Sequence, residues 1–296
     1  MKFYIFILLK LGKKMKRMLF FKTLEHDQIQ CTLCPFNCII KEGKSGNCQV
    51  RINNHGLLKS LIYQKAVSIA LDPIEKKPLY HFYPGSQILS IGTVGCNFHC
   101  QFCQNWEISQ NISLPLKDIT PEYLLSLAKK YNSIGIAYTY SEPIVWFETV
   151  LETAQAFKNA GLKNVMVTNG FINKEPLARL VPFIDAMNID VKSFNQNFYT
   201  KYVSGRLEPI KKNIEYLHDK IHLELTMLII PTLNDDFSDI KSFVSWVASI
   251  DKTIPVHFSR YFPNYKMTIP ATPKETLYKI KDLALQKLDH VYLGNI

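Results

Sequence analysis

Residues 92–106 read GTVGCNFHCQFCQNW and begin inside an apolar run, ILSIGTV, at residues 88–94. Cys96, Cys100 and Cys103 therefore follow a predicted strand with the spacing C-x3-C-x2-C. A closed structural zinc site usually has four ligands, and only three cysteines stand together here. A [4Fe–4S] cluster held by three thiolates instead leaves one iron open to bind another molecule. The spacing favours the open cluster, with zinc as the alternative.

The chain from residue 88 onward alternates short β-rich runs with amphipathic helical patterns. The predicted strands cover residues 88–94, 135–141, 164–170, 186–193, 221–230 and 255–261. The predicted helices cover residues 121–131, 144–160, 174–182, 207–219, 236–250 and 273–288. Apolar strands separated by helices indicate an α/β fold with a parallel sheet, either a doubly wound open sheet or a complete or partial (β/α) barrel. In both folds the chemistry lies at the carboxyl ends of the strands.

Three regions follow from this pattern. Residues 88–296 form the predicted barrel, which ends with a seventh strand at residues 290–296. Residues 24–87 form a loop-rich segment that contains four cysteines and a stretch punctuated by proline. Residues 1–23 are an N-terminal extension that we predict to be disordered or to result from a wrongly assigned start codon. Two methionines within it offer later start sites.

The net charge of +10 is concentrated at the N-terminus. Residues 1–17 hold six Lys or Arg and no acidic residue, and subtracting these six leaves +4 for the rest of the chain. No other basic run is dense enough to predict a dedicated nucleic-acid site. The apolar residues 3–9 are too few to span a membrane. The seven cysteines fall in two clusters, which indicates metal ligation in a reducing cytoplasm rather than a disulfide framework.

Polar residues stand at the carboxyl ends of the predicted strands. The sequence YTYSEP places Glu142 at the start of a helix, where an acidic residue is favourable in its own right. Asn169 begins an ordinary Asn-Gly turn. Asp190 and Lys192 share one face of their strand, and a charged pair on an inward face is costly unless the partners meet each other or a ligand. His257 stands between apolar neighbours, as a hydrogen-bonded core histidine also would.

The cysteine spacing, with the aromatic Phe102 before the last cysteine, resembles the signature of radical S-adenosylmethionine (SAM) enzymes. The resemblance extends over almost the whole chain. It is closest to the radical SAM component of the AmmeMemoRadiSam system, a branch similar to the pyruvate formate-lyase activating enzymes. It implies a partial (β/α)6 barrel, which agrees with the six strand–helix units. It also implies that SAM binds the open iron and is cleaved, by an electron from the cluster, to methionine and a 5′-deoxyadenosyl radical.

The resemblance assigns cofactor-binding roles to particular residues. Glu142 matches the position that contacts the SAM amino group, although Tyr140 and Ser141 replace two glycines of the family's Gly-Gly-Glu-Pro segment. Asp190 and Lys192 match an Asp-x-Lys that binds the ribose and carboxylate end of SAM. Further positions expected near SAM or the substrate are Thr168, Asn169, Asn234, His257, Ser259 and Arg260.

The first cysteine group has the spacing C-x2-C-x3-C-x9-C and consists of Cys31, Cys34, Cys38 and Cys48. Four thiolates this close in sequence suit a closed site, and zinc, a second iron–sulfur cluster and unmetallated thiols all stay open. The resemblance also implies a tail with a Cys-Pro-x-Cys pair after the last strand, which the sequence to Ile296 does not contain. A truncated chain with an incomplete first site is therefore among the expectations.

Together these features predict an oxygen-sensitive cytoplasmic oxidoreductase that uses SAM for hydrogen abstraction. The resemblance implies an electron donor such as flavodoxin or ferredoxin, and either a glycyl radical enzyme or Memo-like and AMMECR-like proteins as partners. Two other functions are open. A zinc-dependent nucleic-acid-binding protein would use both cysteine groups as zinc knuckles, with His99 as a fourth ligand in the second group. A catalytically degenerate scaffold would keep the cluster without turnover.

Overall fold

The computed structural model describes residues 18–296. Residues 1–17 of the predicted N-terminal extension lie outside the described residues. Its last residues form strand β1 (Phe21–Thr23), which pairs antiparallel with β2 (Ile29–Cys31). The prediction of disorder is therefore wrong for this strand, because its backbone is held in a sheet. Among the residues that the structure describes, no helix is long and apolar enough to cross a membrane.

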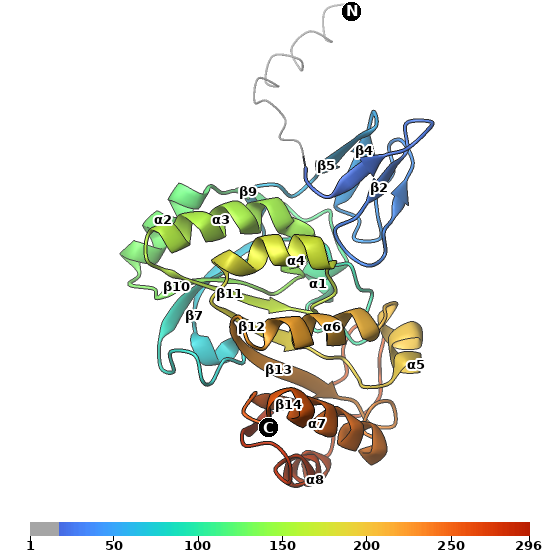
Figure 1. The fold of residues 1–296 in the computed structure, drawn as a ribbon, viewed down its shortest axis with the longest axis vertical. Helices are drawn as coiled ribbons and strands as arrows, with labels where there is room; N and C mark the ends of the chain where they lie inside the picture. The colour runs from blue at the N-terminus through green and yellow to red at the C-terminus, as the bar shows by residue number, and fades with distance from the viewer. Residues whose placement is uncertain (1–17) are drawn as a thin grey trace, which may run out of the picture.

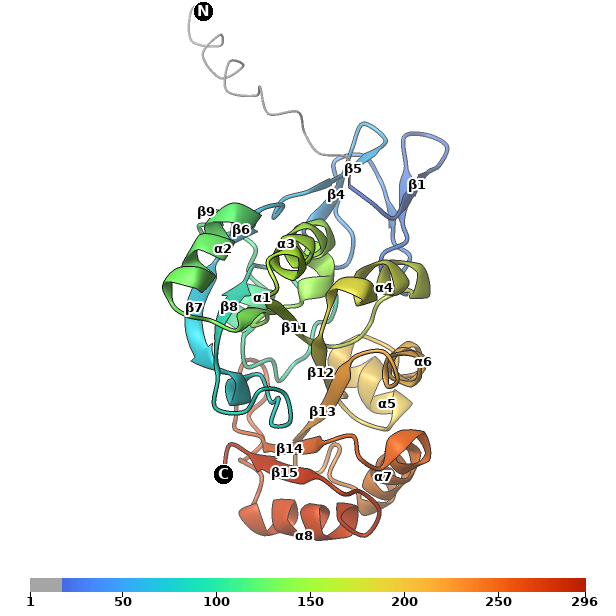
Figure 2. The same cartoon turned by 60° about the vertical axis from the view of Figure 1, so that its left-hand side comes forward.

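The centre of the molecule is one sheet of eight strands (Figure 1 and Figure 2). In spatial order the strands are β15 (Val291–Gly294), β14 (Val256–Arg260), β13 (His222–Ile229), β12 (Ala186–Asp190), β11 (Lys163–Thr168), β10 (Gly135–Tyr138), β8 (Gln87–Gly92) and β7 (Ser68–Pro73). Every pair from β8 to β15 is parallel. Strand β7 runs antiparallel beside β8. The seven predicted strands are all confirmed, most of them a few residues shorter than predicted.

Helices follow these strands in the predicted order and lie outside the sheet (Figure 2). The main helices are α2 (Pro121–Lys130), α3 (Phe147–Asn159), α4 (Lys174–Leu180), α6 (Glu208–Leu217), α7 (Phe237–Asp251) and α8 (Lys274–Ala284). Shorter helical turns are Ile74–Lys76, α1 (Trp106–Ser109), Pro143–Trp146, Val181–Phe183, α5 (Gln196–Phe198) and Tyr199–Val203. Thr120 and Asp236 begin α2 and α7, because their side-chain oxygens accept otherwise unpaired backbone N–H groups. The α/β partial-barrel fold is confirmed.

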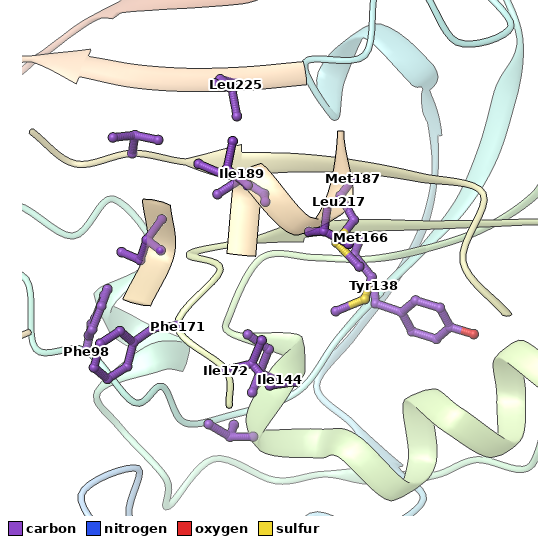
Figure 3. Close-up of a cluster of buried hydrophobic side chains, with 14 of the residues drawn as sticks. Phe98, Tyr138, Ile144, Met166, Phe171, Ile172, Met187, Ile189, Leu217 and Leu225 are labelled. Carbon is purple, nitrogen blue, oxygen red and sulfur yellow. The ribbon is translucent and has the colours of Figure 1, made fainter. Parts of the chain in front are cut away.

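The main hydrophobic core lies between the sheet and its helices. Tyr138, Met166 and Met187 occupy matching positions on β10, β11 and β12, and all three are buried. Figure 3 shows them close together, with Leu217 of α6 beside Met187. Each such side chain contributes about 1.5–3 kcal/mol when it leaves water. Neighbouring residues along the strands point the opposite way, into the barrel, since strand side chains alternate.

The segment between β7 and β8, residues 74–86, fills the barrel at the amino ends of the strands, and we call it the plug. Ile74, Leu79 and Phe82 of the plug form a separate small core with inward-facing strand residues such as Ile88. The barrel is therefore closed at this end by its own chain. Ligands have access from the opposite end, where the parallel strands finish.

Strand β7 and the plug place the barrel's beginning earlier than the sequence pattern indicates. The predicted boundary between residues 87 and 88 separates β7 from its hydrogen-bonded neighbour β8. The run SIALDP ends in Asp72 and Pro73, residues that usually mark loops. Proline is tolerated here because β7 is an edge strand.

The remaining cysteine-rich segment forms small sheets beside α3 and α4 (Figure 1). Strands β1 and β2 continue into β3 (Ile39–Ile40), while β4 (Arg51–Asn54) and β5 (Leu57–Ser60) form a hairpin. Strand β6 (Lys65–Ala66) pairs with β9 (Lys117–Asp118). Arg51 of β4 forms a buried ion pair with Glu148 of α3, and their closest N–O distance is 2.9 Å. The segment is thus fixed on the barrel through charge as well as through apolar contacts.

Glu224 of β13 fastens the plug to the barrel wall. Its buried carboxylate accepts hydrogen bonds from His222 and His257 at 2.9 and 2.6 Å, and from the backbone N–H groups of Tyr80 and His81 at 3.0 and 2.8 Å. Burial alone would raise the pKa of Glu224. The side-chain and backbone donors outweigh burial and lower the pKa to about 2. The carboxylate stays ionised because every donor is built into the fold.

We predict that Glu224→Gln lowers the free energy of unfolding by about 1–3 kcal/mol at pH 7, because the amide is a weaker acceptor for these donors. Folding lowers the pKa of Glu224 from 4.5 to about 2, so its stabilising effect is complete above the unfolded value and is lost as the pH falls through about 2. Urea unfolding at pH 7 and pH 3 measures this, and the gap between variant and wild type should shrink at pH 3. A gap that widens on acidification would contradict the prediction. The exposed Asp282→Asn on α8 is the matched control and should change stability by less than about 0.5 kcal/mol.

Candidate active site

A cavity of about 360 Å³ opens at the carboxyl ends of the parallel strands. The sequence-predicted residues that line it are Cys96, Cys100, Cys103, Glu142, Thr168, Asn169, Asp190, Lys192 and Ser259. They come from the ends of four different strands and from the loop after β8. The fold therefore brings together residues that are up to 163 positions apart in the sequence, from Cys96 to Ser259.

The three cysteines of the second group line the cavity as free thiols. The backbone N–H of Phe98 donates to Cys96 Sγ at 3.3 Å, and Ser109 Oγ lies 3.2 Å from Cys103 Sγ. Burial raises the pKa of Cys96 well above its usual value and that of Cys100 to about 12. Thiolates at these positions need a strongly positive partner, which a bound metal centre supplies.

His99 does not supply a fourth ligand to this group. Its Nδ1 lies 2.7 Å from Gln110 Oε1 and its Nε2 lies 3.0 Å from the carbonyl oxygen of Asn47. Both ring nitrogens are therefore used in holding the cysteine loop, and the interpretation of His99 as a zinc ligand is wrong. The thiol set has three members, which leaves one position of a cluster open for a ligand.

Glu142 joins the ends of two strands behind the cavity. Its carboxylate accepts hydrogen bonds from Thr168 Oγ1 at 2.6 Å, from Asn169 N at 2.9 Å and from Ile144 N at 3.0 Å. Burial raises its pKa to about 7, although each of these donors acts in the opposite direction. Glu142 thus caps the helical turn that follows it, rather than lying in the first turn as predicted, and it also lines the cavity.

Asp190 and Lys192 point into the cavity from the end of β12. The Lys192 ammonium lies 2.9 Å from the Asp190 carboxylate, and both groups are partly accessible. Burial alone would lower the pKa of Lys192, but Asp190 and Cys100 raise it above its usual value. The pair therefore offers a permanent cation and a hydrogen-bond acceptor beside the cysteines.

Asn169 and Asn97 together position Cys96. Asn169 Nδ2 donates to Asn97 Oδ1 at 2.8 Å and lies 3.9 Å from Cys96 Sγ. The buried Asn97 in turn donates to the carbonyl oxygen of Phe171 at 3.0 Å. Sequence reasoning missed Asn97, although its place directly after a cysteine in a polar loop was a usable signal.

Three of the predicted residues lie outside the cavity lining. His257 is buried below the cavity, where its side chain forms a hydrogen bond with Glu224. It therefore has the structural role of a hydrogen-bonded core histidine. Asn234 donates to the carbonyl oxygens of Lys192 and Leu228, each at 2.8 Å, and thereby ties the ends of β12 and β13 together. Arg260 donates to the carbonyl oxygen of Thr272 at 2.7 Å. Each of these three side chains thus has a hydrogen bond to a protein group outside the cavity lining, and its contact with SAM or the substrate stays a prediction.

Tyr140 and Lys77 complete the cavity wall, and neither was predicted to do so. Tyr140 has a φ of 71°, a left-handed conformation that costs about 1 kcal/mol for a residue other than glycine. Its hydroxyl donates to Asp72 Oδ2 at 2.5 Å, and Lys77 Nζ donates to the same oxygen at 2.7 Å. These two donors lower the pKa of Asp72, although burial opposes them. Residues from β7 and the plug therefore shape the site.

Comparison with known proteins places this geometry in a family. Residues 90–244 match the family model described as the Radical SAM superfamily. The chain belongs to the radical SAM superfamily. This result removes the support for a zinc-dependent nucleic-acid-binding protein.

Individual proteins are similar to this chain in sequence or in fold. The chain is 43% identical to an uncharacterized protein of Methanocaldococcus jannaschii over 288 residues, which cover 95% of this chain and 86% of that one. It is 24% identical to the pyruvate formate-lyase-activating enzyme of Listeria monocytogenes over 65% of this chain and 77% of that enzyme. Streptococcus suis SuiB, solved bound to S-adenosylmethionine, is similar in fold, with a TM-score of 0.55 and 13% identity over 70% of this chain. The chain spans about half of SuiB, 51% of its length.

Membership of the radical SAM superfamily implies a [4Fe–4S] cluster and SAM, and the residues present fit both. A cluster binds its thiolates through separate irons, whereas a single zinc ion needs all its ligands about 2.0–2.3 Å from one point. The three cysteines share one cavity wall. Among the described residues, no three His, Cys, Asp or Glu side chains are arranged to hold one ion. Glu142, Asp190 and Lys192 line the same cavity and offer charged groups to the ammonium and carboxylate of SAM.

We expect Asn97→Ala to lower the free energy of unfolding by about 1–3 kcal/mol, since Asn169 Nδ2 loses its oxygen acceptor and the Phe171 carbonyl loses its donor. Iron bound per chain after anaerobic reconstitution should also fall, because Cys96 loses its support. Urea unfolding and iron analysis measure the two effects. The exposed Asn111→Ala in the same loop is the control and should match wild type in both. Full iron loading with wild-type stability in Asn97→Ala would show that the asparagine does not position the loop.

Proposed function

We propose that this chain cleaves SAM reductively and uses the resulting radical to abstract a hydrogen atom from a substrate. One observation carries the proposal: three thiols, joined by no fourth ligand among residues 18–296, share a cavity with Glu142 and with the Asp190–Lys192 pair. When bound, a [4Fe–4S] cluster supplies the electron that splits SAM into methionine and a 5′-deoxyadenosyl radical. The protein's contribution is binding and orientation.

The charged residues of the cavity suit the two ends of SAM. Lys192 can donate to the methionine carboxylate, and charge-assisted hydrogen bonds of this kind contribute about 1.5–3 kcal/mol each. Asp190 can accept from the ribose hydroxyls. Glu142 faces the same cavity with a carboxylate held in place by three donors, and it can accept from the methionine ammonium group. These assignments rest on charge complementarity and on the resemblance of the motifs.

The fold also suits a reaction that must exclude water. The plug closes the amino end of the barrel with apolar side chains, so a reactive intermediate at the carboxyl end meets solvent only through the mouth. Phe98 and Phe102 line the cavity beside the cysteines and keep the cluster side of the site apolar. A bound substrate would cover the mouth and complete the enclosure.

We further propose that the substrate is presented by another protein, because relatives of this chain are named as activating enzymes of other enzymes, pyruvate formate-lyase and (2S)-3-sulfopropanediol dehydratase among them. In one version the hydrogen comes from a glycine of a glycyl radical enzyme, the partner class that appears in the name of a Methanocaldococcus jannaschii relative. In the other the chain works with Memo-like and AMMECR-like proteins as the AmmeMemoRadiSam component. A flavodoxin or ferredoxin in the cytoplasm would supply the electron in both.

The cysteine assignment predicts that Cys103→Ala abolishes SAM cleavage, whereas Cys31→Ala retains the open cluster. The test is anaerobic reconstitution with iron and sulfide, followed by an assay for 5′-deoxyadenosine after SAM and dithionite are added. About four irons per chain should be lost in the Cys103 variant relative to wild type. If Cys103→Ala still produced 5′-deoxyadenosine, the assignment would be wrong. Wild-type protein that binds four irons without cleaving SAM would instead support the degenerate scaffold.

Lys192→Met should weaken SAM binding about 10- to 100-fold, because it removes a charged hydrogen-bond donor from the cavity. Equilibrium dialysis with labelled SAM and cluster-loaded protein measures this, and iron analysis confirms that the cluster is still present. The exposed Lys174→Met on α4 keeps the same change in net charge and should bind SAM like wild type. Equal affinity in the Lys192 and Lys174 variants would remove Lys192 from the SAM site.

A further inference from the structure

The first cysteine group forms a second, closed site away from the barrel mouth. We call it the four-cysteine site, and its thiols belong to Cys31, Cys34, Cys38 and Cys48. All four line one small cavity, which Ile144 and Val145 of the barrel cover. Burial is the main cause that raises the pKa of Cys34 to about 12 and that of Cys48 to about 11, and the charges of neighbouring thiols add to it. The fold thus gathers four thiols from a stretch of loop and strand into one apolar enclosure.

Arg51 lines the same cavity and has an unused hydrogen-bond donor. Its Nη1 donates to both oxygens of Glu148 at 3.1 and 2.9 Å, and its Nη2 donates to the carbonyl oxygen of Leu19 at 2.6 Å. The side chain is 1% exposed, and its Nε–H has no acceptor among the described residues. Leaving such a buried donor unpaired costs about 1–3 kcal/mol. A native fold usually meets such a donor with an acceptor, and here that acceptor is not a protein group.

We propose that the four-cysteine site binds an anionic metal centre whose sulfur atoms accept a hydrogen bond from Arg51 Nε. Four thiolates around Zn²⁺ or around a [4Fe–4S]²⁺ core leave a net charge of about −2, which favours an N–H donor of a charged group beside the sulfurs, although Glu148 already pairs with this guanidinium. Second-sphere donors of this kind are a regular part of metal sites and tune their affinity. The same guanidinium lies close enough to Cys31 and Cys48 for their charges to raise its pKa further. This centre goes beyond the proposed SAM chemistry and does not depend on it.

The four thiols leave the choice between zinc and an iron–sulfur cluster to experiment. In the described part of the chain they are not yet arranged as the ligands of one ion, so Zn²⁺ would draw the sulfurs inward. The cavity that they line has a volume of about 20 Å³, room for about one water molecule, so a [4Fe–4S] core would need it to widen. Iron with sulfide, and zinc alone, are therefore both tried.

The proposed centre lies directly behind the SAM-site loop. The backbone N–H of Asn47 donates to Cys38 Sγ at 3.4 Å, and its side-chain Nδ2 donates to the carbonyl oxygen of Asn97 at 2.7 Å. A single residue thus links a thiol of the four-cysteine site to the residue that follows Cys96. Loading of the four-cysteine site should consequently order the loop that holds the open cluster.

Metal analysis of three proteins tests the centre itself. Full-length wild type, Cys34→Ala and Cys100→Ala are each reconstituted anaerobically with iron and sulfide, and in parallel with zinc, and bound metal and sulfide are counted. Wild type should hold one metal centre more than either variant, because each variant loses a different site. About eight irons per wild-type chain, or about four irons with one zinc, supports the proposal and identifies the metal. Equal metal in wild type and Cys34→Ala overturns it. Failure of the proposed SAM site would show separately: wild type and Cys100→Ala would then bind equal amounts of metal, because Cys100 would hold no cluster.

The role of Arg51 is tested by metal retention. Arg51→Met alone would leave Glu148 as a buried unpaired charge, so the double variant Arg51→Met/Glu148→Gln removes both charges together. Competition with a chelator should show about 10- to 100-fold weaker retention of the second centre than in wild type. The exposed Lys41→Met in the same segment is the control and should retain it like wild type. A double variant that is folded by circular dichroism and holds the centre as tightly as wild type overturns the proposal for Arg51.

Discussion

Arg51 of β4 and Glu148 of α3 form an ion pair that is buried from water, although they lie 97 residues apart in the sequence. Breaking such a pair by removing one partner typically costs about 3–5 kcal/mol, because the other charge stays buried. The two side chains therefore require the cysteine-rich segment to sit in one place on the barrel. That placement brings Asn47 against Asn97 and sets the four-cysteine site behind the loop of the second cysteine group.

The parallel sheet imposes the second constraint, because it sorts inward-facing side chains into layers. Along β12, Asn188, Asp190 and Lys192 follow one another at every second position and all line the cavity. In the adjoining strand Glu224 lies beside Asn188 and Thr226 beside Asp190. The deeper layer is closed by the plug, whose backbone N–H groups bind Glu224. The layer nearer the carboxyl ends, which contains Asp190 and Lys192, faces the cavity and is open to ligands. Glu224 lies in the layer below and holds the plug in place.

Residues whose role depends on local sequence could be predicted. The alternation of strands and helices, the cysteine spacing and the i, i+2 relation of Asp190 and Lys192 are local patterns, and each is seen in the structure. Residues whose role depends on distant contacts could not. His257 occurs on the strand where the family places a cavity residue, but Glu224, 33 residues away, holds it in the deeper layer. Strand β7 was missed because an edge position, which a sequence does not reveal, makes its proline harmless.

Tyr140 shows how the N-terminal part of the chain shapes the site as well as supporting it. A glycine would adopt its φ of 71° without strain, so the tyrosine needs contacts that offset about 1 kcal/mol. Its hydroxyl finds Asp72 of β7, and its ring lies 4.6 Å from the ammonium of Lys77 in the plug. Neither partner belongs to the parallel strands. Tyr140 is therefore an aromatic wall of the cavity that β7 and the plug anchor. The shape of the cavity therefore depends on residues that precede the barrel's first parallel strand.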